Sequence, residues 1–348
     1  PPCSAQPAPP PAVVPQRDKM MVPMHQPQEI SLSTLPRPII ALSSCLAGEE
    51  VRFDGAHKRD RWLLKELGKF VDYRTFCPEV GIGLGIPRPP IRLMLRNGET
   101  RVVGVADAGI DVTERLQNYA FDTLPRLQDI SGYVFKSKSP SCGMFRVKRY
   151  NTKGHPEGTG IGAYAEVISQ QMPDLPIEEE GRLCDAVLRE NFVNRVFVYQ
   201  RLQELLQRGV DAKSLIAFHS DHKYLVMAHS QAAYKRLGQL LSDLKGKDMQ
   251  RIGLEYRHEL MTALHRRVSR ARHVNVLQHI QGYLKDRIDG GDKAELATAI
   301  EDYRRGEVPL VVPIRLFRHY FRHHPDDYIA RQVYLDPAPA SLGLRNHV

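Results

Sequence analysis

The stretch RPIIALSSCLAG (residues 37–48) decides the fold of the first half of the chain. Its apolar run ends in small residues, which is typical of a buried strand that enters a loop. Two more short strands are predicted, at the start of VDYRTFCPEVGIGLGIPRPP (71–90) and in ISGYVF (130–135). Helical spacing of apolar residues predicts helices in 59–70, 111–128 and 160–172. Strands that alternate with helices predict an α/β fold with a largely parallel sheet.

Two further segments of this half have local signals. IRLMLRNGETRVVGV (91–105) places Asn97 and Gly98 between two alternating runs, which predicts a β-hairpin. PIEEEGRL (176–183) contains three consecutive glutamates, and we interpret it as the solvated start of a helix.

Composition divides the chain into four parts. Residues 1–33 are rich in Pro, Gln and Met without periodicity, so we expect a disordered tail. We predict an α/β domain over 34–180, a connecting amphipathic helix over 181–209 and a basic α-helical domain over 210–348.

Three cysteines, Cys45, Cys77 and Cys142, fall at or just past the carboxyl ends of the predicted strands. In an open parallel sheet these ends lie along one edge, where ligands bind, so the three thiols can meet at one site. Three thiolates are one ligand short of a closed zinc site and suit a [4Fe–4S] cluster with one open iron. Since a lone cysteine is more often a small buried hydrophobic residue, the pattern alone leaves a metal site and a coincidence both open.

The remaining cysteines bear on the compartment. Cys3 lies in the expected tail, and Cys184 lies on an apolar helical face, where we expect it in the core. Five widely spaced cysteines do not favour a disulfide framework, and PPCSAQPAPPPAVVPQ (1–16) has neither region of a signal peptide. We therefore expect a reducing cytoplasm.

The charge balance favours a polyanionic partner. The 348 residues include 49 Lys and Arg against 40 Asp and Glu, a net charge of +9. Such a surplus is typical of proteins that bind nucleic acid, although an unspecialised basic surface is the plainer reading. We expect no membrane span, because no run approaches roughly 18 uninterrupted apolar residues.

Three motifs resemble the thiouracil desulfidase family: SSCLAGEEVRFDGAHKR (43–59), FCPEVGIGLGIPRPPIRL (76–93) and KSKSPSCG (136–143). The resemblance covers roughly residues 37–175. The later motifs FHSDHKYLVMAHS, YKRLG, VPLVVPIRL and YLDPAP resemble the YbgA-type helical domain. The pairing is similar to that of the two-domain RNA 4-thiouridine desulfidases.

The resemblance implies a cofactor and a reaction. It implies that Cys45, Cys77 and Cys142 hold a [4Fe–4S] cluster whose open iron binds the sulfur of a thiocarbonyl. Iron that draws electrons from the C=S bond makes its carbon more electrophilic, so water adds and oxygen replaces sulfur. The net change is a hydrolysis that needs no electron transfer.

Such a hydrolysis needs groups that move protons. Glu79, two residues after Cys77, is our first candidate to orient or deprotonate the water, with a turn cap as the plain alternative. Ser139 and Ser141 can bind the base or assist proton transfer, or simply cap the turn. Lys136 and Lys138 can stabilise anionic sulfur or hold a phosphate, or be solvated surface lysines.

Further charged residues follow the first two cysteines. Asp54, His57, Lys58 and Arg59 come after the first cysteine loop and can pair with the cluster environment or grip a substrate phosphate. Arg88 lies in a stiff Pro-rich loop that can present it to an anion.

The second half concentrates Arg, Lys and His. His219, His222 and His229 can share a helix face, which we interpret as a basic, phosphate-facing helix rather than a metal site. LHRRVSRARH (264–273) and RLFRHYFRHHP (315–325) suit contact with phosphates and stacking on exposed bases. The alternative is surface Arg and His on helices whose aromatics face the core.

These inferences combine into one hypothesis: a desulfidase that acts on 4-thiouridine in tRNA, with the helical domain binding the RNA. A desulfidase of free thiouracil or thionucleosides, and a non-catalytic metal-thiolate RNA-binding protein, are the alternatives.

Overall fold

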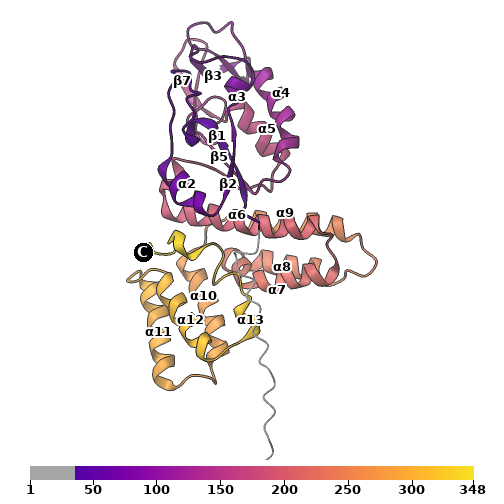
Figure 1. Cartoon of the computed structure of the whole chain (residues 1–348), viewed down its shortest axis with the longest axis vertical. Helices are drawn as coiled ribbons and strands as arrows, with labels where there is room; N and C mark the ends of the chain where they lie inside the picture. The colour runs from indigo at the N-terminus through magenta and orange to yellow at the C-terminus, as the bar shows by residue number, and fades with distance from the viewer. Residues whose placement is uncertain (1–35) are drawn as a thin grey trace, which may run out of the picture. The chain divides into compact units, whose positions relative to one another are not determined.

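A four-stranded parallel sheet forms the centre of the first half of the chain (Figure 1). Its strand order is β2-β1-β5-β8. The strands are β1 (Ile39–Ser43), β2 (Asp72–Phe76), β5 (Gly132–Phe135) and β8 (Ile177–Glu179). This computed structural model describes residues 36–348, so the expected tail and Cys3 lie outside the described residues. The predicted α/β class with a parallel sheet is confirmed.

The two central strands are buried on both faces. Ile40, Ala41 and Leu42 of β1 and Tyr133, Val134 and Phe135 of β5 have no exposed surface. Continuous apolar runs of this kind are typical of parallel strands that are covered on both sides. The central position of β1 explains why residues 37–48 carry the signal for the whole sheet.

A second four-stranded sheet, of order β4-β3-β6-β7, was not predicted. Its β3 (Ile91–Arg96) and β4 (Glu99–Gly104) form the predicted antiparallel hairpin. Its other strands are β6 (Val147–Tyr150) and β7 (Pro156–Gly160). β7 is mostly exposed and contains Pro and Gly, so its sequence gives no alternating signal.

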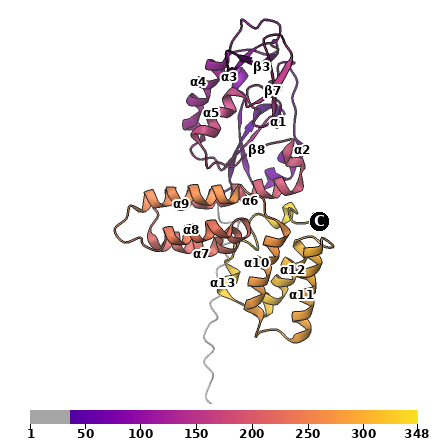
Figure 2. The ribbon, with the colours of Figure 1, turned by 180° about the vertical axis from the view of Figure 1, so that it is seen from behind.

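The helices of this half are α1 (Ser44–Ala47), α2 (Arg61–Lys65), α3 (Pro78–Gly81), α4 (Thr113–Thr123) and α5 (Ala163–Gln171). Three of them, α2, α4 and α5, are shorter than the predicted segments 59–70, 111–128 and 160–172, and the single turns α1 and α3 were not predicted. α4 and α5 pack side by side on one face of the parallel sheet, as Figures 1 and 2 show.

The three consecutive glutamates are not the solvated start of a helix. Glu178 and Glu179 are buried in strand β8, and each of Glu178, Glu179 and Glu180 accepts hydrogen bonds from the chain. Glu178 accepts from Arg182 at 2.6 Å, and Glu179 from the amides of Met144 and Phe145 at 2.7 and 3.0 Å. Such partners allow acidic residues to lie in a strand, and those of Glu179 are 34 and 35 positions away, where local pattern cannot reveal them.

The second half is helical, as predicted. Its helices are α6 (Ala186–Gln207), α7 (Ala212–His229), α8 (Gln231–Leu240), α9 (Met249–Leu264), α10 (Arg270–Gln281), α11 (Gly290–Arg305), α12 (Val311–His323) and α13 (Asp327–Ala330). α6 is buried from Phe192 to Gln200, because one side packs on the sheet and the other on α9 (Figures 1 and 2). It approaches β5 so closely that a Cβ at Gly132 would lie 2.8 Å from Val196.

Two predicted RNA-facing segments are wrong in part. His222 and His229 of α7 are buried, and their Nδ1 atoms donate to the carbonyls of Phe218 and Arg266 at 2.7 and 2.6 Å. Burial lowers the pKa of His222 to about 3 and that of His229 to about 4, so neither ring is a cation at neutral pH. In α12, Phe317 and Tyr320 are buried, so these rings pack in the core and do not stack on bases.

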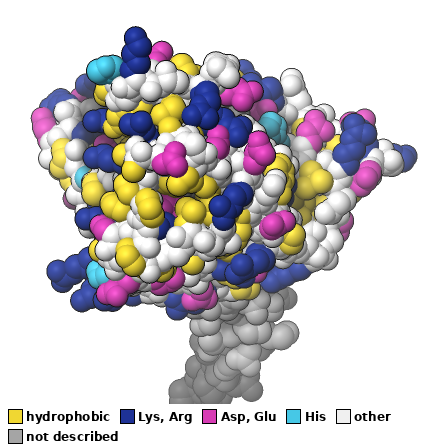
Figure 3. Space-filling model, turned by 90° about the horizontal axis from the view of Figure 1, so that it is seen from above, with side chains coloured by type: hydrophobic (Ala, Val, Ile, Leu, Met, Phe, Trp, Pro, Cys, Tyr) yellow, Lys and Arg dark blue, Asp and Glu magenta, His cyan; other side chains and the backbone are white. Residues whose placement is uncertain are grey.

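Basic side chains are spread over the surface. Figure 3, which looks onto the α/β half from the end that carries β3 and β7, shows Lys and Arg around a central group of hydrophobic side chains, with acidic residues between them. None of the helices within residues 36–348 is long and apolar enough to cross a membrane.

Candidate functional site

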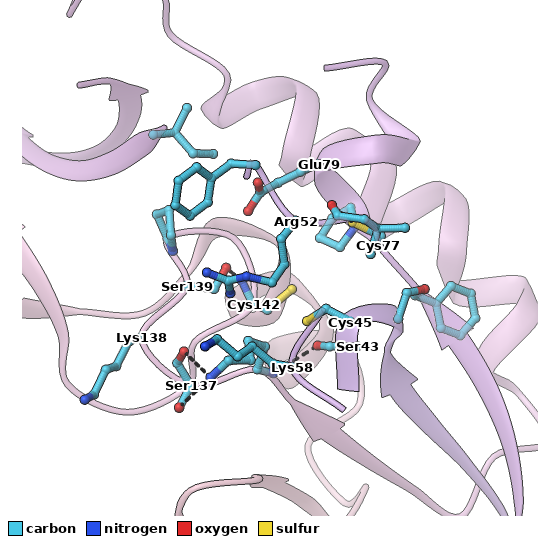
Figure 4. A pocket seen from close by; sticks show the side chains of 18 of the residues that line it. Ser43, Cys45, Arg52, Lys58, Cys77, Glu79, Ser137, Lys138, Ser139 and Cys142 are labelled. Carbon is cyan, nitrogen blue, oxygen red and sulfur yellow. Dashed lines mark hydrogen bonds between the residues drawn. The ribbon is translucent and has the colours of Figure 1, made fainter. Parts of the chain in front are cut away.

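Cys45, Cys77 and Cys142 line one cavity of about 350 Å³ at the carboxyl edge of the parallel sheet. Figure 4 shows the sulfurs of Cys45 and Cys142 directed into the same space. The volume falls within the range of roughly 300–1,000 Å³ that is usual for small-molecule sites. The predicted meeting of three cysteines that are 32 and 65 residues apart is therefore observed.

Each cysteine is placed by the element that precedes it. Cys45 lies in the single helical turn α1 directly after β1, and Cys77 is the residue between β2 and α3. Cys142 lies in a loop after β5 that folds on itself, because Ser139 Oγ accepts from the amides of Ser141 and Cys142 at 3.2 and 3.1 Å. Glu179 anchors the far side of this loop through the amides of Met144 and Phe145.

Burial disfavours ionisation of the three free thiols. It raises the pKa of Cys45 to about 11, against a smaller opposite effect of Lys136, and also raises the pKa of Cys77 and of Cys142. A hydrogen bond with Ser43 acts in the opposite direction on Cys142. Because thiolates are the metal ligands, a bound metal centre would have to supply the positive charge that stabilises them.

Glu79 is held in one orientation at the wall of the cavity. Arg88 donates to its Oε2 from Nε at 2.9 Å and from Nη2 at 2.7 Å, and Ser141 Oγ donates to its Oε1 at 2.8 Å. The side chains of Glu79 and Arg88 are 14% and 3% exposed, which makes this a nearly dry ion pair. The arrangement fixes a carboxylate beside the thiols and leaves it able to accept a further proton or hydrogen bond.

The structure places both Ser141 and Arg88 against Glu79. Ser141 is fully buried and does not line the cavity, so it reaches the site only through Glu79. Arg88 lines the cavity, but its guanidinium is engaged with Glu79 and with the carbonyl of Gly85 at 3.0 Å. It is thus not free to present its charge to an anion.

Lys136 also lines the cavity, where it is paired with Glu180. Its Nζ also donates to Ser137 O and Oγ at 3.1 and 3.0 Å, and Glu180 accepts from the Ser137 amide and hydroxyl at 2.7 Å each. Its own amide donates to Ser43 Oγ at 2.9 Å. The lysine ammonium is thus fixed next to the thiol of Cys45.

The cavity is also lined by Arg52, Phe53, Lys58, Lys138 and Ser139. Asp54, His57 and Arg59 of the same predicted charged segment do not line it. Cys184 is exposed, which contradicts its expected place in the core, because it lies in a 3₁₀ turn ahead of α6 rather than on a buried helical face.

Sequence reasoning missed Glu180 and Ser43 as residues of the site. Both residues form hydrogen bonds with Lys136, although Glu180 is 44 positions and Ser43 is 93 positions away from it in the sequence. The only available signal was their position at the ends of strands β8 and β1, where side chains meet at the carboxyl edge.

The three thiols do not converge on a single ion. Within residues 36–348, no three His, Cys, Asp or Glu side chains come close enough together to hold one metal ion. A polynuclear iron–sulfur centre distributes its cysteines over different irons, so it needs its thiols around a cavity rather than at a point. The soft donor set around one cavity thus fits such a cluster.

Two family models match this chain. That of 2-thiouracil desulfurase matches residues 40–180, and that of a protein of unknown function, DUF1722, matches residues 223–339. A solved structure of the [4Fe-4S]-dependent thiouracil desulfidase TudS is 33% identical in sequence, covers 42% of this chain and 94% of that chain, and has a TM-score of 0.35.

Two curated relatives are also similar. Uncharacterized protein YbgA of Escherichia coli (strain K12) is 33% identical over 153 residues, which are 44% of this chain and 90% of the relative. Uncharacterized protein YbbK of Bacillus subtilis (strain 168) is 34% identical over 141 residues, which are 38% of this chain and 90% of the relative. The chain therefore belongs to the family of these relatives and joins a 2-thiouracil desulfurase domain to a DUF1722 domain.

Proposed function

We propose that this protein is a desulfidase that replaces the sulfur of a thiolated pyrimidine by oxygen through hydrolysis. The observation that carries the proposal is the single cavity lined by three thiols, a fixed carboxylate and a fixed ammonium group. The 2-thiouracil desulfurase match over the same residues supports it.

The cofactor in this proposal is a [4Fe–4S] cluster held by Cys45, Cys77 and Cys142. Three thiolates leave one iron without a protein ligand. When bound, the cluster supplies a Lewis-acidic iron with an affinity for soft sulfur, which polarises the thiocarbonyl.

Glu79 is the residue that handles the water. Its carboxylate is paired with Arg88 and oriented by Ser141, which places it to accept a proton from water that adds to the C=S carbon. Arg88 and Ser141 are then positioning residues, and they act only through Glu79. The bonds balance: a C–O bond forms, the C–S bond breaks, and the two protons of water leave with sulfur as hydrogen sulfide.

Lys136 and Ser139 also act in the cavity. The Lys136 ammonium stabilises negative charge on the departing sulfur, and Glu180 keeps it in place. The Ser139 hydroxyl oxygen accepts hydrogen bonds from two backbone amides, and its proton can still be donated to the pyrimidine base.

The finer part of the proposal is the substrate, 4-thiouridine in tRNA. The net charge of +9 and the additional helical half support an RNA substrate over free thiouracil, since a neutral base needs neither. A base within a folded RNA would have to leave its stack to reach a cavity of this depth. The free base is the second candidate, and a non-catalytic RNA-binding role the third.

The division of the chain remains part of the proposal. We assign the chemistry to residues 34–180, a connecting role to 181–209 and RNA binding to 210–348. The described cysteines are all free thiols, which is consistent with the reducing cytoplasm that an iron–sulfur enzyme needs.

Iron and acid-labile sulfide content, with sulfide release from thiolated substrates, tests this function on the full chain purified without oxygen. We expect about four irons and four sulfides per chain, and hydrogen sulfide from 4-thiouridine tRNA. Cys142→Ser should lose both iron and sulfide release, whereas Cys184→Ser, at an exposed thiol outside the cavity, should lose neither. Iron-free protein after attempted reconstitution would refute the enzyme and favour the binding protein.

A further inference from the structure

Cations at the inner and outer parts of the cavity are treated differently. The inner ones are neutralised, Arg88 by Glu79 and Lys136 by Glu180. At the outer part, neither Lys58 nor Lys138 takes part in any ion pair within residues 36–348, although both line the cavity and both are exposed. A neutral base that reacts in the cavity needs no such outer charge, so these lysines call for another explanation.

Arg52 is a third cation that lines the cavity, and it has spare hydrogen-bonding capacity. Its Nε is buried and has no hydrogen-bond partner among the described residues. This Nε forms an ion pair with Oδ1 of Asp54 in the same loop at 3.4 Å, without the geometry of a hydrogen bond. An unsatisfied guanidinium donor that lines a cavity is suited to an anionic ligand.

Lys138 is held in an unfavourable backbone conformation. Its φ of 62° lies in the left-handed region, where an L-residue with a Cβ is strained and glycine is not. Figure 4 shows its side chain on the outer side of the loop, directed away from the thiols, whereas Arg52 extends into the cavity. A strained residue that lines a cavity is a frequent mark of a functional position.

An aromatic surface lies beside these charges. Phe53 lines the same cavity with 39% of its surface exposed, and the Arg52 guanidinium carbon is 5.3 Å from the centre of its ring. Bases that have left a stack are usually bound on aromatic rings or guanidinium planes. The cations Arg52, Lys58 and Lys138 together with the exposed ring of Phe53 are suited to binding a nucleotide, whose phosphate is anionic and whose base is aromatic.

We infer that Arg52, Lys58 and Lys138 form a phosphate-binding subsite at the mouth of the cavity, so that the substrate enters as a nucleotide with its thiolated base inward. The inference rests on the proposed desulfidase function and adds to it the chemistry outside the base. It also assigns part of the RNA grip to the α/β half. The phosphate can belong to an RNA strand or to a free nucleotide.

Lys138→Gly tests the subsite, because glycine removes the ammonium and at the same time relieves the backbone strain. Arg146→Gly is the matched control: Arg146 is an exposed cation with a φ of 55° that does not line the cavity. Both are compared with the wild type as cluster-loaded full chains. The three substrates are 4-thiouridine, its 5′-monophosphate and a short oligoribonucleotide with one 4-thiouridine.

For Lys138→Gly we expect KM for the phosphate-bearing substrates to rise about fivefold to tenfold relative to that for the nucleoside. The salt dependence of oligonucleotide binding should become weaker by about 0.7 in log–log slope, the value of one single-strand phosphate contact. Its thermal midpoint should be no lower than that of the wild type. Arg146→Gly should retain the wild-type ratios. A rise for the oligonucleotide alone assigns the phosphate to an RNA strand, and a rise for both assigns it to the nucleotide itself.

Unchanged KM ratios and an unchanged salt slope in Lys138→Gly would overturn the subsite. A wild type that releases no sulfide from any of the three substrates would instead refute the desulfidase function. In that case, equal oligonucleotide affinities of the wild type and Lys138→Gly, measured by fluorescence anisotropy, would refute the subsite as well.

Discussion

Glu79 depends on two residues, Arg88 and Ser141, for its fixed position in the site. A carboxylate with both oxygens engaged by Arg88 and Ser141 cannot rotate, and the guanidinium of Arg88 lies against it in a nearly dry wall. Fixed orientation with one remaining acceptor direction is what water activation requires. Glu79 therefore carries the first prediction.

Glu79→Gln should keep the cluster and lose turnover by a factor of about 10² to 10⁴, the usual worth of general base catalysis. The amide fills the same volume but cannot take a proton, and it leaves the buried Arg88 without its counterion. Sulfide release and the visible spectrum, measured together, separate loss of chemistry from loss of iron. Glu157→Gln, at an exposed glutamate of β7, should behave as the wild type; normal turnover in Glu79→Gln would assign the base elsewhere.

Ser141→Ala tests orientation alone. Its hydroxyl touches Glu79 and not the cavity, so its removal should lower kcat by about tenfold, in proportion to one hydrogen bond of roughly 1.5 kcal/mol to a charged group. KM and iron content should be retained. A rise in KM without a fall in kcat would mean that Ser141 contacts the substrate instead.

At this scale the sequence predicted identities better than roles. The cysteines, Glu79 and Lys136 could be found because each follows a strand and parallel strands bring their ends together. The roles of Ser141 and Arg88 depend on their contacts with Glu79, which lies 62 and 9 positions away from them in the sequence. Glu180 was misread because its partner, Lys136, is 44 positions away. Spacing does not encode such pairings.

At the scale of elements, the cysteine loop and helix α5 are packed backbone against backbone. The amide of Gly162 donates to the carbonyl of Gly143 at 2.7 Å, and the amides of Tyr164 and Ala165 donate to the carbonyl of Ser141 at 3.2 and 3.1 Å. The start of α5 thereby fixes the position of Cys142. The helix itself could be predicted from its apolar spacing, but its close contact with the loop could not.

Gly162→Ala should therefore disturb the cysteine site without touching any ligand. A Cβ at Gly162 would lie 2.5 Å from the carbonyl carbon of Ser141 and 2.9 Å from the amide nitrogen of Cys142, so backbone must move. We expect a loss of about 1–3 kcal/mol in the free energy of unfolding, as for other overpacked sites, and a reduced iron content.

Gly238→Ala is the control for this substitution. Gly238 lies in α8, and a Cβ there would meet nothing within 4 Å. Since alanine is the better helix former, the variant should be more stable by up to about 1 kcal/mol and bind iron normally. Wild-type iron content and stability in Gly162→Ala would show that the loop can yield at this contact.

At the scale of the whole molecule, the two halves are joined through polar groups as well as through the core. Gln203 of α6 donates to the carbonyl of Gln128 at 2.6 Å, and Asp174 accepts from Arg257 and His258 of α9 at 3.3 and 2.8 Å. The hydrophobic core also continues from the sheet into the helices. Stability of the helical half therefore matters for the site, although no residue of α7–α13 lines the cavity.

Buried neutral histidines make that stability depend on pH. The pKa values of His222 and His229, lowered chiefly by burial to about 3 and about 4, lie below the value of about 6.5 that each ring has in the unfolded chain. The unfolded state thus binds more protons below pH 6.5. Stability is fully present above that pH and falls as the pH decreases toward 4.

At pH 5 each histidine should lower the free energy of unfolding by about 2 kcal/mol relative to pH 7.5, because one pKa unit corresponds to roughly 1.4 kcal/mol. Urea midpoints followed by far-ultraviolet circular dichroism at the two pH values measure the change. His222→Gln is expected to be less stable at pH 7.5 but to lose less between the two pH values, since one titrating ring is gone.

The exposed His319 of α12 provides the comparison that isolates burial as the cause. His319→Gln removes an imidazole that is exposed instead of buried, so the full pH dependence should persist. If His222→Gln showed the same loss between pH 7.5 and pH 5 as the wild type, the acid sensitivity would have to come from other groups. The conclusion that His222 and His229 of α7 are buried and neutral would then be wrong. These histidines could again be considered as cations that face RNA.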